Sequence, residues 1–320
     1  MKITAIAVAT LSLLASHAFA APSQYTLTVE PYQAESHFNY QIDSSAGNPI
    51  YGSPTSELDF KGMHSSGVTL SLDVDDGGSY QTLSLSLAKG GGSDGTMIDD
   101  DYFTQDYVGA GNPTRFSRTL SNSKMNDSFE IAWSGGWAFR PNNAYVTNAR
   151  LGFGFAFAQY QFEATGLTIL EDPYAMYGSN KTLFSSGESV ITIKSEQMLS
   201  SLDVMLNKEF GNGFALKTKA SAIYLGFNQS QDDHLKRTDL GSPSIKLTSI
   251  NYGLKAAIDA SYTYNSIVFS LGANYLYTAP YNDNGTAEFF DANDKSIGGS
   301  KLLSHKFEQL SYHAGIGYRF

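Results

Sequence analysis

Two short acidic segments carry the residue types that a hydrolytic site needs. One is the run Met-Ile-Asp-Asp-Asp-Tyr, which contains Asp99 and Asp101, and the other is Gln-Asp-Asp-His, which contains Asp232 and His234. In an extended chain, side chains two residues apart point to the same side. Asp99 and Asp101 therefore share one face, and Asp232 shares a face with His234.

This spacing suits the activation of a water molecule held between the two segments. We expect His234 to act as a general base, oriented and made more basic by Asp232. Asp99 and Asp101 would position the water and share a proton, because two carboxylates this close resist double ionisation.

Other interpretations of the same acidic residues stay open. Acidic side chains in exposed loops are usually solvated, or they bind divalent cations between lipopolysaccharide phosphates. An Asp-rich loop also offers hard oxygen ligands for calcium, but the spacing of an EF-hand is absent. We expect no metal at this site.

The composition excludes several classes of protein. With 21 basic and 31 acidic residues, the chain has a formal net charge of −10, which argues against nucleic acid as a partner. The chain has no cysteine, so disulfides and thiolate metal sites are excluded. Charged residues make up 16%, below the roughly 25% of average soluble domains. Aromatic residues reach 13%, which is typical of a chain that meets lipid with every second residue.

The first twenty residues have the features of a signal peptide. A basic start is followed by a short apolar run and by the small-x-small sequence Ala-Phe-Ala, which ends at Ala20. We therefore expect residues 1–20 to be a cleaved signal peptide and residues 21–320 to form a single domain.

The C-terminal stretch alternates between apolar and polar residues, which predicts a strand with one lipid-facing side. Tyr318 and Phe320 lie on its apolar side, and aromatic residues at the end of a strand are typical of membrane interfaces. A soluble β-sandwich is the alternative that this pattern leaves open. Ten such segments alternate with tight turns and long loops, at residues 35–42, 56–74, 80–87, 127–139, 144–163, 190–209, 214–227, 250–264, 267–277 and 307–320.

The pattern thus predicts an all-β fold, a ten-stranded antiparallel transmembrane β-barrel of the outer-membrane type. The long loops are expected outside the cell and the turns in the periplasm, with both acidic segments at loop bases. A barrel of this size is too narrow for an open aqueous pore once side chains fill its lumen. Function is therefore expected at the loop end.

Several motifs resemble the omptins, the ten-stranded outer-membrane aspartyl-type proteases of Gram-negative bacteria. The resemblance extends over most of the mature chain, and the matching segments are Ser56 to Lys61, Met97 to Tyr102, Asn112-Pro113, Ser117-Arg118, Gly136-Trp137 and Asp232 to His234.

The resemblance implies an activity and a set of site residues. Asp99 and Asp101 correspond to the family's acidic pair, and Asp232 and His234 to its His–Asp dyad. His234 would activate a water that attacks a peptide carbonyl, with no covalent acyl-enzyme. The implied substrate is an extracellular peptide or protein, and the implied location is the outer membrane of a Gram-negative cell. We expect a monomer without a cofactor, and a role for lipopolysaccharide as activator stays open.

The chain departs from the family at its specificity pocket. The two acidic residues that select Arg or Lys there correspond to Ser230 and, by a looser alignment, to Asn48. Without a carboxylate to pair with a guanidinium, we expect a preference for neutral side chains. Ser117 is retained as a secondary candidate, and Arg115, which replaces an acid near the pair, is expected to screen the pair's charge.

The family's lipopolysaccharide-binding positions also differ. They correspond here to Gln159 and Glu196, with Lys194 nearby, so phosphate binding at this surface is not expected from charge. Two alternatives to a protease therefore stay open: a non-enzymatic barrel that serves as a surface adhesin or receptor, and, less favoured, a small porin.

Overall fold

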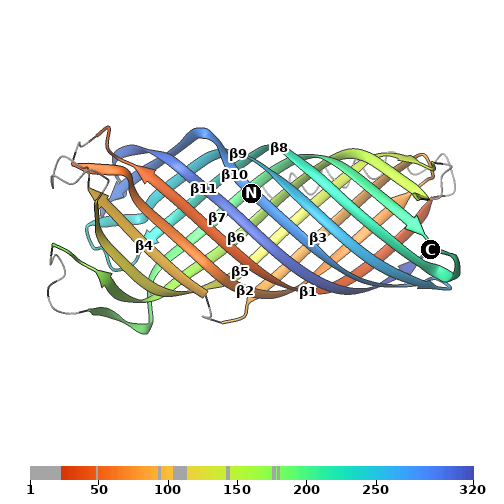
Figure 1. Ribbon diagram of the computed structural model, residues 1–320, viewed down its shortest axis with the longest axis horizontal. Helices are drawn as coiled ribbons and strands as arrows, with labels where there is room; N and C mark the ends of the chain where they lie inside the picture. Colours follow the sequence, from red (N-terminus) through yellow and green to blue (C-terminus); the bar gives the residue numbers. More distant parts are fainter. Residues whose placement is uncertain are drawn as a thin grey trace.

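A single antiparallel sheet contains all the strands that the structure describes, and it closes into a barrel (Figure 1). The computed structural model describes residues 23–47, 50–92, 95–103, 114–141, 145–174, 178 and 181–320. Its strands are β1 (Gln24–Asp43), β2 (Tyr51–Asp75), β3 (Ser79–Gly90), β4 (Gly95–Phe103), β5 (Thr114–Phe139), β6 (Asn148–Glu171), β7 (Thr182–Glu209), β8 (Phe214–His234), β9 (Leu240–Tyr264), β10 (Ile267–Asp291) and β11 (Ser296–Arg319). A single 3₁₀ turn, η1 (Gly211–Gly213), joins β7 to β8.

Closure of the ring comes from β1, which pairs with both β2 and β11. Each of β3 and β4 pairs with β2 on one side and with β5 on the other, so the two share one position in the ring. The described strands therefore occupy ten positions, which confirms the predicted fold. Within the described part of the chain, no helix is long and apolar enough to cross a membrane.

Side-chain alternation places an apolar belt on the outside of the barrel. Exposed aliphatic and aromatic residues of this belt include Val68, Leu70, Leu87, Leu151, Phe153, Phe155, Val204, Ile258 and Phe269. Exposed aromatic residues border it toward the tight turns, at Trp137, Phe139, Phe214, Tyr264, Tyr318 and Phe320, and toward the loops, at Tyr224, Phe227, Tyr252 and Tyr281. A belt between two aromatic girdles is the lipid-facing surface of a transmembrane barrel.

At the loop end, on the left of Figure 1, the strands continue into segments expected to be loops. The predicted loops at 89–116, 165–187, 228–244 and 281–300 are therefore wrong in part, since β4 and the outer halves of β5 to β11 fill much of them. In particular, Asp99 and Asp101 lie within β4, and Asp232 and His234 end β8. The prediction failed because these extensions lack the apolar alternation of the belt, while backbone pairing still holds them in the sheet.

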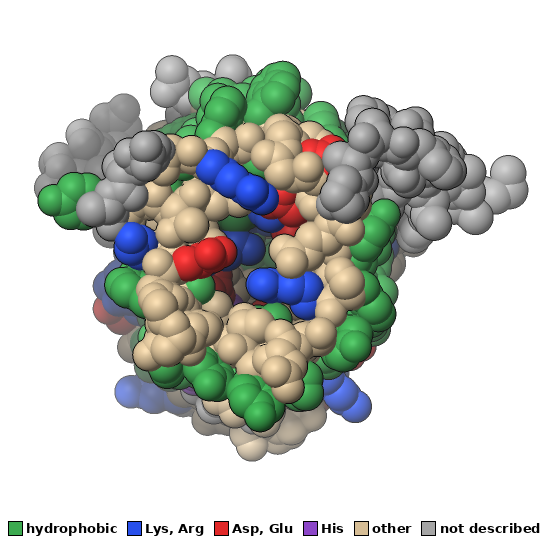
Figure 2. Space-filling view, turned by 90° about the vertical axis from the view of Figure 1, so that its right-hand side faces the viewer, with side chains coloured by type: hydrophobic (Ala, Val, Ile, Leu, Met, Phe, Trp, Pro, Cys, Tyr) green, Lys and Arg blue, Asp and Glu red, His purple; other side chains and the backbone are tan. Residues whose placement is uncertain are grey.

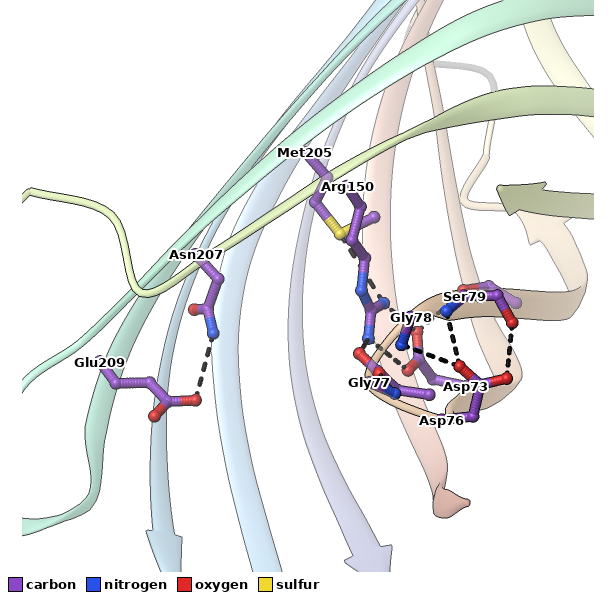
Figure 3. Close-up of polar contacts among 11 residues, drawn as sticks. Asp73, Asp76, Gly77, Gly78, Ser79, Arg150, Met205, Asn207 and Glu209 are labelled. Atoms are coloured by element: carbon purple, nitrogen blue, oxygen red, sulfur yellow. Dashed lines mark hydrogen bonds and ion pairs between the residues drawn. The ribbon is translucent and has the colours of Figure 1, made fainter. Parts of the chain in front are cut away.

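Tight turns connect the strands at the opposite end, and the β2–β3 turn is drawn in Figure 3. Asp76 accepts hydrogen bonds from the backbone nitrogens of Gly78 (2.9 Å) and Ser79 (2.6 Å), while Gly77 takes a positive φ of 84°. Beside the turn, Arg150 of β6 donates to Asp73 of β2 at 2.8 Å. These contacts tie neighbouring hairpins together at this end.

Charged side chains surround a central hollow at the turn end, which faces the viewer in Figure 2. Deeper in the lumen, a cavity of about 270 Å³ is lined by polar and charged groups that include Glu130, Lys219 and Lys255. Lys255 pairs with Glu130 at 3.3 Å, and Lys219 pairs with Asp203 at 2.9 Å, so buried charge in this part of the lumen is matched.

An aromatic layer fills the lumen toward the loop end. The rings of Phe38 and Phe162 stack with centroids 5.1 Å apart, and those of Tyr160 and Phe307 approach to 4.3 Å. Phe60 joins them, and Phe38, Phe60, Phe162 and Phe307 have no exposed surface. The site residues of β4 and β8 lie beyond this layer.

Candidate active site

The acidic pair lies on the inner face of β4. Met97 on that face is fully buried in the core, and Asp99 and Asp101 follow it at intervals of two residues. The intervening Asp100 points to the other face, where Nε of Arg118 lies 3.0 Å from its Oδ1. The ladder with β2 and β5 thus fixes which carboxylates reach the barrel mouth.

Ser117 of β5 is directly opposite Asp101 in the ladder and is almost fully buried. Its hydroxyl donates a hydrogen bond of 2.9 Å to Oδ2 of Asp101. Ser117 therefore belongs to the site as the residue that orients one member of the acidic pair.

Burial and mutual repulsion change the ionisation of the pair. Burial raises the pKa of Asp99 well above its ordinary value, and the nearby charge of Asp101 raises it further. Burial also raises the pKa of Asp101, although the hydrogen bond from Ser117 opposes this shift. The two carboxyl groups are therefore set to hold a proton at pH values where an exposed pair would have lost it.

The second half of the site lies at the end of β8. Asp232 has no exposed surface, and its Oδ1 lies 3.1 Å from Nδ1 of His234, whose side chain is 19% exposed. The backbone nitrogen of His234 donates to Oγ of Ser244 at 2.9 Å, which holds the strand end in place. Because Nδ1 faces the carboxylate, Nε2 is the ring nitrogen that can accept a proton from a substrate or water.

The charge of Asp232 makes His234 a strong base. Burial alone would lower the pKa of His234, but the carboxylates of Asp232 and Asp99 outweigh burial and raise this pKa to about 9. At neutral pH the imidazole is therefore mostly protonated, and it becomes a competent base as the pH rises.

The two halves act on each other across the mouth, although β5, β6 and β7 separate β4 from β8 along one side of the ring. The charge of His234 lowers the pKa values of both Asp99 and Asp101, and Asp232 raises that of Asp99. Four ionisable groups from two distant hairpins are thus electrostatically coupled. These are the four residues that the sequence pattern selected as a candidate site. Among the described residues, no group of three or more His, Asp or Glu side chains is placed to hold a metal ion.

The predicted specificity position, Ser230, lies two residues before Asp232 on the same face of β8 and is fully buried. Its Oγ is hydrogen-bonded to Nε2 of His305 at 2.8 Å, and Nδ1 of His305 is hydrogen-bonded to Oγ of Ser249 at 2.8 Å. Burial lowers the pKa of His305 to about 3, so this ring is neutral. The floor beside the dyad is therefore polar and uncharged.

Other predicted positions have different outcomes. Asn48 lies outside the described residues, as do residues 1–20 and Asn112-Pro113. Arg115 pairs with Glu171 at 2.5 Å and lies 3.6 Å from Asp100, so its observed partners are on the outer face and the expected screening of the acidic pair is not observed.

The outer surface at the predicted lipopolysaccharide positions carries little net charge. Lys194 is neutralised by Glu196 at 2.7 Å, and Gln159 is opposite Glu196 in the ladder.

Two residues of the site had no signal in the sequence. Tyr40 of β1 donates a hydrogen bond to Oδ2 of Asp232, and His305 of β11 supports Ser230. Neither lies near a recognisable motif, because the barrel brings them to the dyad from strands distant in sequence.

Comparison with solved structures bears on the fold. The outer membrane protease OmpT from Escherichia coli superposes with a TM-score of 0.69 at 15% sequence identity, covering 93% of this chain and 96% of that chain. This chain has the fold of an outer-membrane β-barrel. The outer membrane protein OprG from Pseudomonas aeruginosa aligns at 11% identity with a TM-score of 0.39, covering 94% of this chain and 97% of that chain. No protein-family model matches the chain. No curated protein matches its sequence.

Proposed function

We propose that this protein is an outer-membrane endopeptidase that hydrolyses peptide bonds with an activated water at the loop end of the barrel. The observation that carries the proposal is the placement of Asp99 and Asp101 on the inner face of β4 and of the Asp232–His234 pair at the end of β8, at the loop end beyond the membrane belt. The likeness in fold to a barrel described as an outer membrane protease supports it further.

The arrangement suits the following reaction. Neutral His234 takes a proton from the water through Nε2 while the water oxygen attacks the peptide carbonyl carbon. Asp232 stabilises the imidazolium that forms, and the Asp99–Asp101 pair holds the water by hydrogen bonds. The imidazolium then gives its proton to the amide nitrogen as the C–N bond breaks. No side chain becomes acylated, and the products are a carboxylate and an amine.

The neutral floor beside the dyad favours substrates with uncharged residues next to the scissile bond. Ser230 and neutral His305 offer no charge to pair with a buried Arg or Lys side chain. We infer that the loop end faces outside the cell and meets peptides or proteins there. A monomer suffices, because both halves of the site come from one chain.

The proposal is tested by offering a peptide library to the protein purified in detergent, with and without lipopolysaccharide. Wild type is expected to cleave, while Asp99→Ala and His234→Ala are expected to lose nearly all activity. His37→Ala is the matched control, because His37 forms a His–Asp pair with Asp59 on the outer face of the sheet. Cleavage that persists in Asp99→Ala and His234→Ala would exclude the proposed mechanism.

The same protein samples test the alternative of a surface adhesin or receptor. Position 230 holds a serine and no acidic residue, which favours this alternative over a protease that selects Arg or Lys. It predicts that no peptide is cut under any condition and that ligand binding at the loops survives His234→Ala. The aromatic layer across the lumen gives no support to the porin alternative.

A further inference from the structure

A tyrosine hydroxyl from β1 contacts the buried carboxylate of the dyad on β8, although the two residues are distant in sequence. The hydroxyl of Tyr40 donates a hydrogen bond to Oδ2 of Asp232, 192 residues away in sequence. The other oxygen, Oδ1, is the one that lies 3.1 Å from Nδ1 of His234. Tyr40 and Asp232 both have no exposed surface. The carboxylate of Asp232 therefore lies between a neutral donor and the imidazole.

The chemistry of this donor matters for the dyad. A buried carboxylate needs a hydrogen-bond donor on each oxygen, or its ionised form is strongly disfavoured. A Lys or Arg in place of Tyr40 would satisfy Asp232 but would also cancel the negative charge that acts on His234. Burial, followed by the charge of Asp232, raises the pKa of Tyr40 well above its ordinary value, so the hydroxyl stays neutral. Tyr40 thus satisfies one oxygen and leaves Asp232 charged.

The tyrosine itself is rigidly held. On β1 it is opposite Leu58 of β2 and His305 of β11 in the ladders. Its ring meets that of Phe38 edge-on, with centroids 6.2 Å apart, at the top of the aromatic layer. Because neither the strand nor the ring can move without disturbing this core, the hydroxyl is fixed relative to β8.

We propose that Tyr40 is a positioning residue of the site, which fixes the orientation of Asp232 and draws part of its charge away from His234. The catalytic consequence rests on the proposed function, whereas the effect on His234 does not. With the hydroxyl of Tyr40 in place, Oδ1 of Asp232 stays beside Nδ1 of His234. The imidazole is then less basic than it would be beside a carboxylate that accepts no other hydrogen bond.

Other charged groups also act on His234, and the test has to leave them unchanged. Those that interact with it from β4, β8 and the connection after β8 are Asp99, Asp101, Asp232, Arg237 and Asp239. The substitution Tyr40→Phe removes one hydroxyl, which donates to Asp232, and replaces none of these charged groups. Tyr160→Phe is the matched control, since Tyr160 is a buried tyrosine of the same aromatic layer and has no contact with the dyad in the structure.

The first measurement is an NMR titration of ¹³C-labelled histidine in detergent, with the His234 signal assigned from its loss in His234→Gln. In Tyr40→Phe the midpoint of His234 is expected to move to higher pH, because Asp232 then concentrates its charge on the imidazole. Tyr160→Phe should titrate as wild type does. A His234 midpoint in Tyr40→Phe that is unchanged, or lower than in wild type, would overturn the proposal.

The second measurement is peptide cleavage at neutral pH. Loss of a hydrogen bond to a buried charged group removes a large stabilising free energy. We therefore expect kcat in Tyr40→Phe to fall about tenfold to a hundredfold, with KM nearly unchanged. The fall should shrink as the pH approaches the new midpoint, and in an Asp232→Asn background Tyr40→Phe should have little further effect. A loss of kcat equal to that in Tyr160→Phe, or equally large in the Asp232→Asn background, would show a packing role and contradict the proposal.

The titration and the cleavage assay together separate this inference from the proposed function. If wild type cleaves no peptide, the proposed function fails, and the titration still decides whether Tyr40 acts on the dyad. If wild type cleaves and the titration is unchanged in Tyr40→Phe, the protease assignment stands and the role of Tyr40 fails. Thermal unfolding of each variant in detergent shows that the barrel is intact before either measurement.

Discussion

Asp232 is fully buried, yet its Oδ1 lies only 3.1 Å from Nδ1 of a histidine that retains some exposure at the barrel mouth, His234. The pair therefore joins a carboxylate in the barrel interior to an imidazole at the end of the barrel where a substrate can enter. Burial alone would keep the imidazole neutral, so its raised pKa of about 9 reports the negative charge around it.

The first prediction concerns the pH dependence of cleavage. Because His234 works as a base only when it has lost its proton, kcat/KM should rise about tenfold per pH unit at neutral pH and level off near pH 9. Initial rates on a neutral peptide over pH 6 to 10 measure this rising limb of the pH profile. A profile that falls from pH 6 upward would contradict the role of His234.

Asp99→Asn should shift that limb in a defined direction. The charge of Asp99 raises the pKa of His234, so its removal should move the limb of any residual activity to lower pH. The rate at the plateau should fall strongly, because the amide cannot share a proton with Asp101. An unshifted limb would show that the two residues do not face each other across the mouth.

The same substitution should stabilise the fold. The pKa of Asp99 is raised in the folded state, so its ionisation costs stability at every pH above its unfolded value, and the cost is complete above the folded pKa. Asp99→Asn removes that cost at neutral pH, and we expect it to unfold at a higher temperature than wild type in detergent. The difference should disappear near pH 3. A lower unfolding temperature at neutral pH would contradict the raised pKa.

Ser117→Ala tests the support of the acidic pair. Loss of the hydrogen bond to Asp101 should raise the pKa of that carboxyl further, because the bond favours its charged form. We expect kcat to fall about tenfold, the value of a hydrogen bond to a charged group. Ser121→Ala is the control, since Ser121 is a buried serine on the same face of β5, opposite Met97. Equal losses in the two variants would show that the hydroxyl of Ser117 has no special role.

Specificity should not change with a single substitution at Ser230. In Ser230→Asp the new carboxylate would lie beside His305, which should bind a proton and neutralise it. Cleavage next to Arg or Lys is therefore expected only when His305→Gln is added. A peptide-library profile of wild type, both single variants and the double variant measures this. Strong cleavage next to Arg by Ser230→Asp alone would contradict the role given to His305.

Much of the barrel could be predicted from sequence because lipid imposes a period-two pattern on the belt, as in the alternation that ends at Phe320. The extensions beyond the belt could not, because both faces of β4 carry acidic residues, Asp99 and Asp101 on one face and Asp100 on the other. Backbone pairing with β2 and β5 alone keeps it extended.

The candidate site could likewise be predicted only in part. The spacing of Asp99 with Asp101 and of Asp232 with His234 was visible along the chain, and the strand geometry now places each pair on one face. Tyr40 and His305 could not be found that way, since their contacts depend on which strands the closed ring brings together.

The most direct measurement is cleavage of a peptide library at pH 9 by purified wild type and by His234→Ala, with His37→Ala as control. Wild type and His37→Ala should cut next to uncharged residues, and His234→Ala should leave the library intact. Equal cleavage by wild type and His234→Ala, or none by wild type with or without lipopolysaccharide, would contradict a peptidase built on the Asp232–His234 dyad.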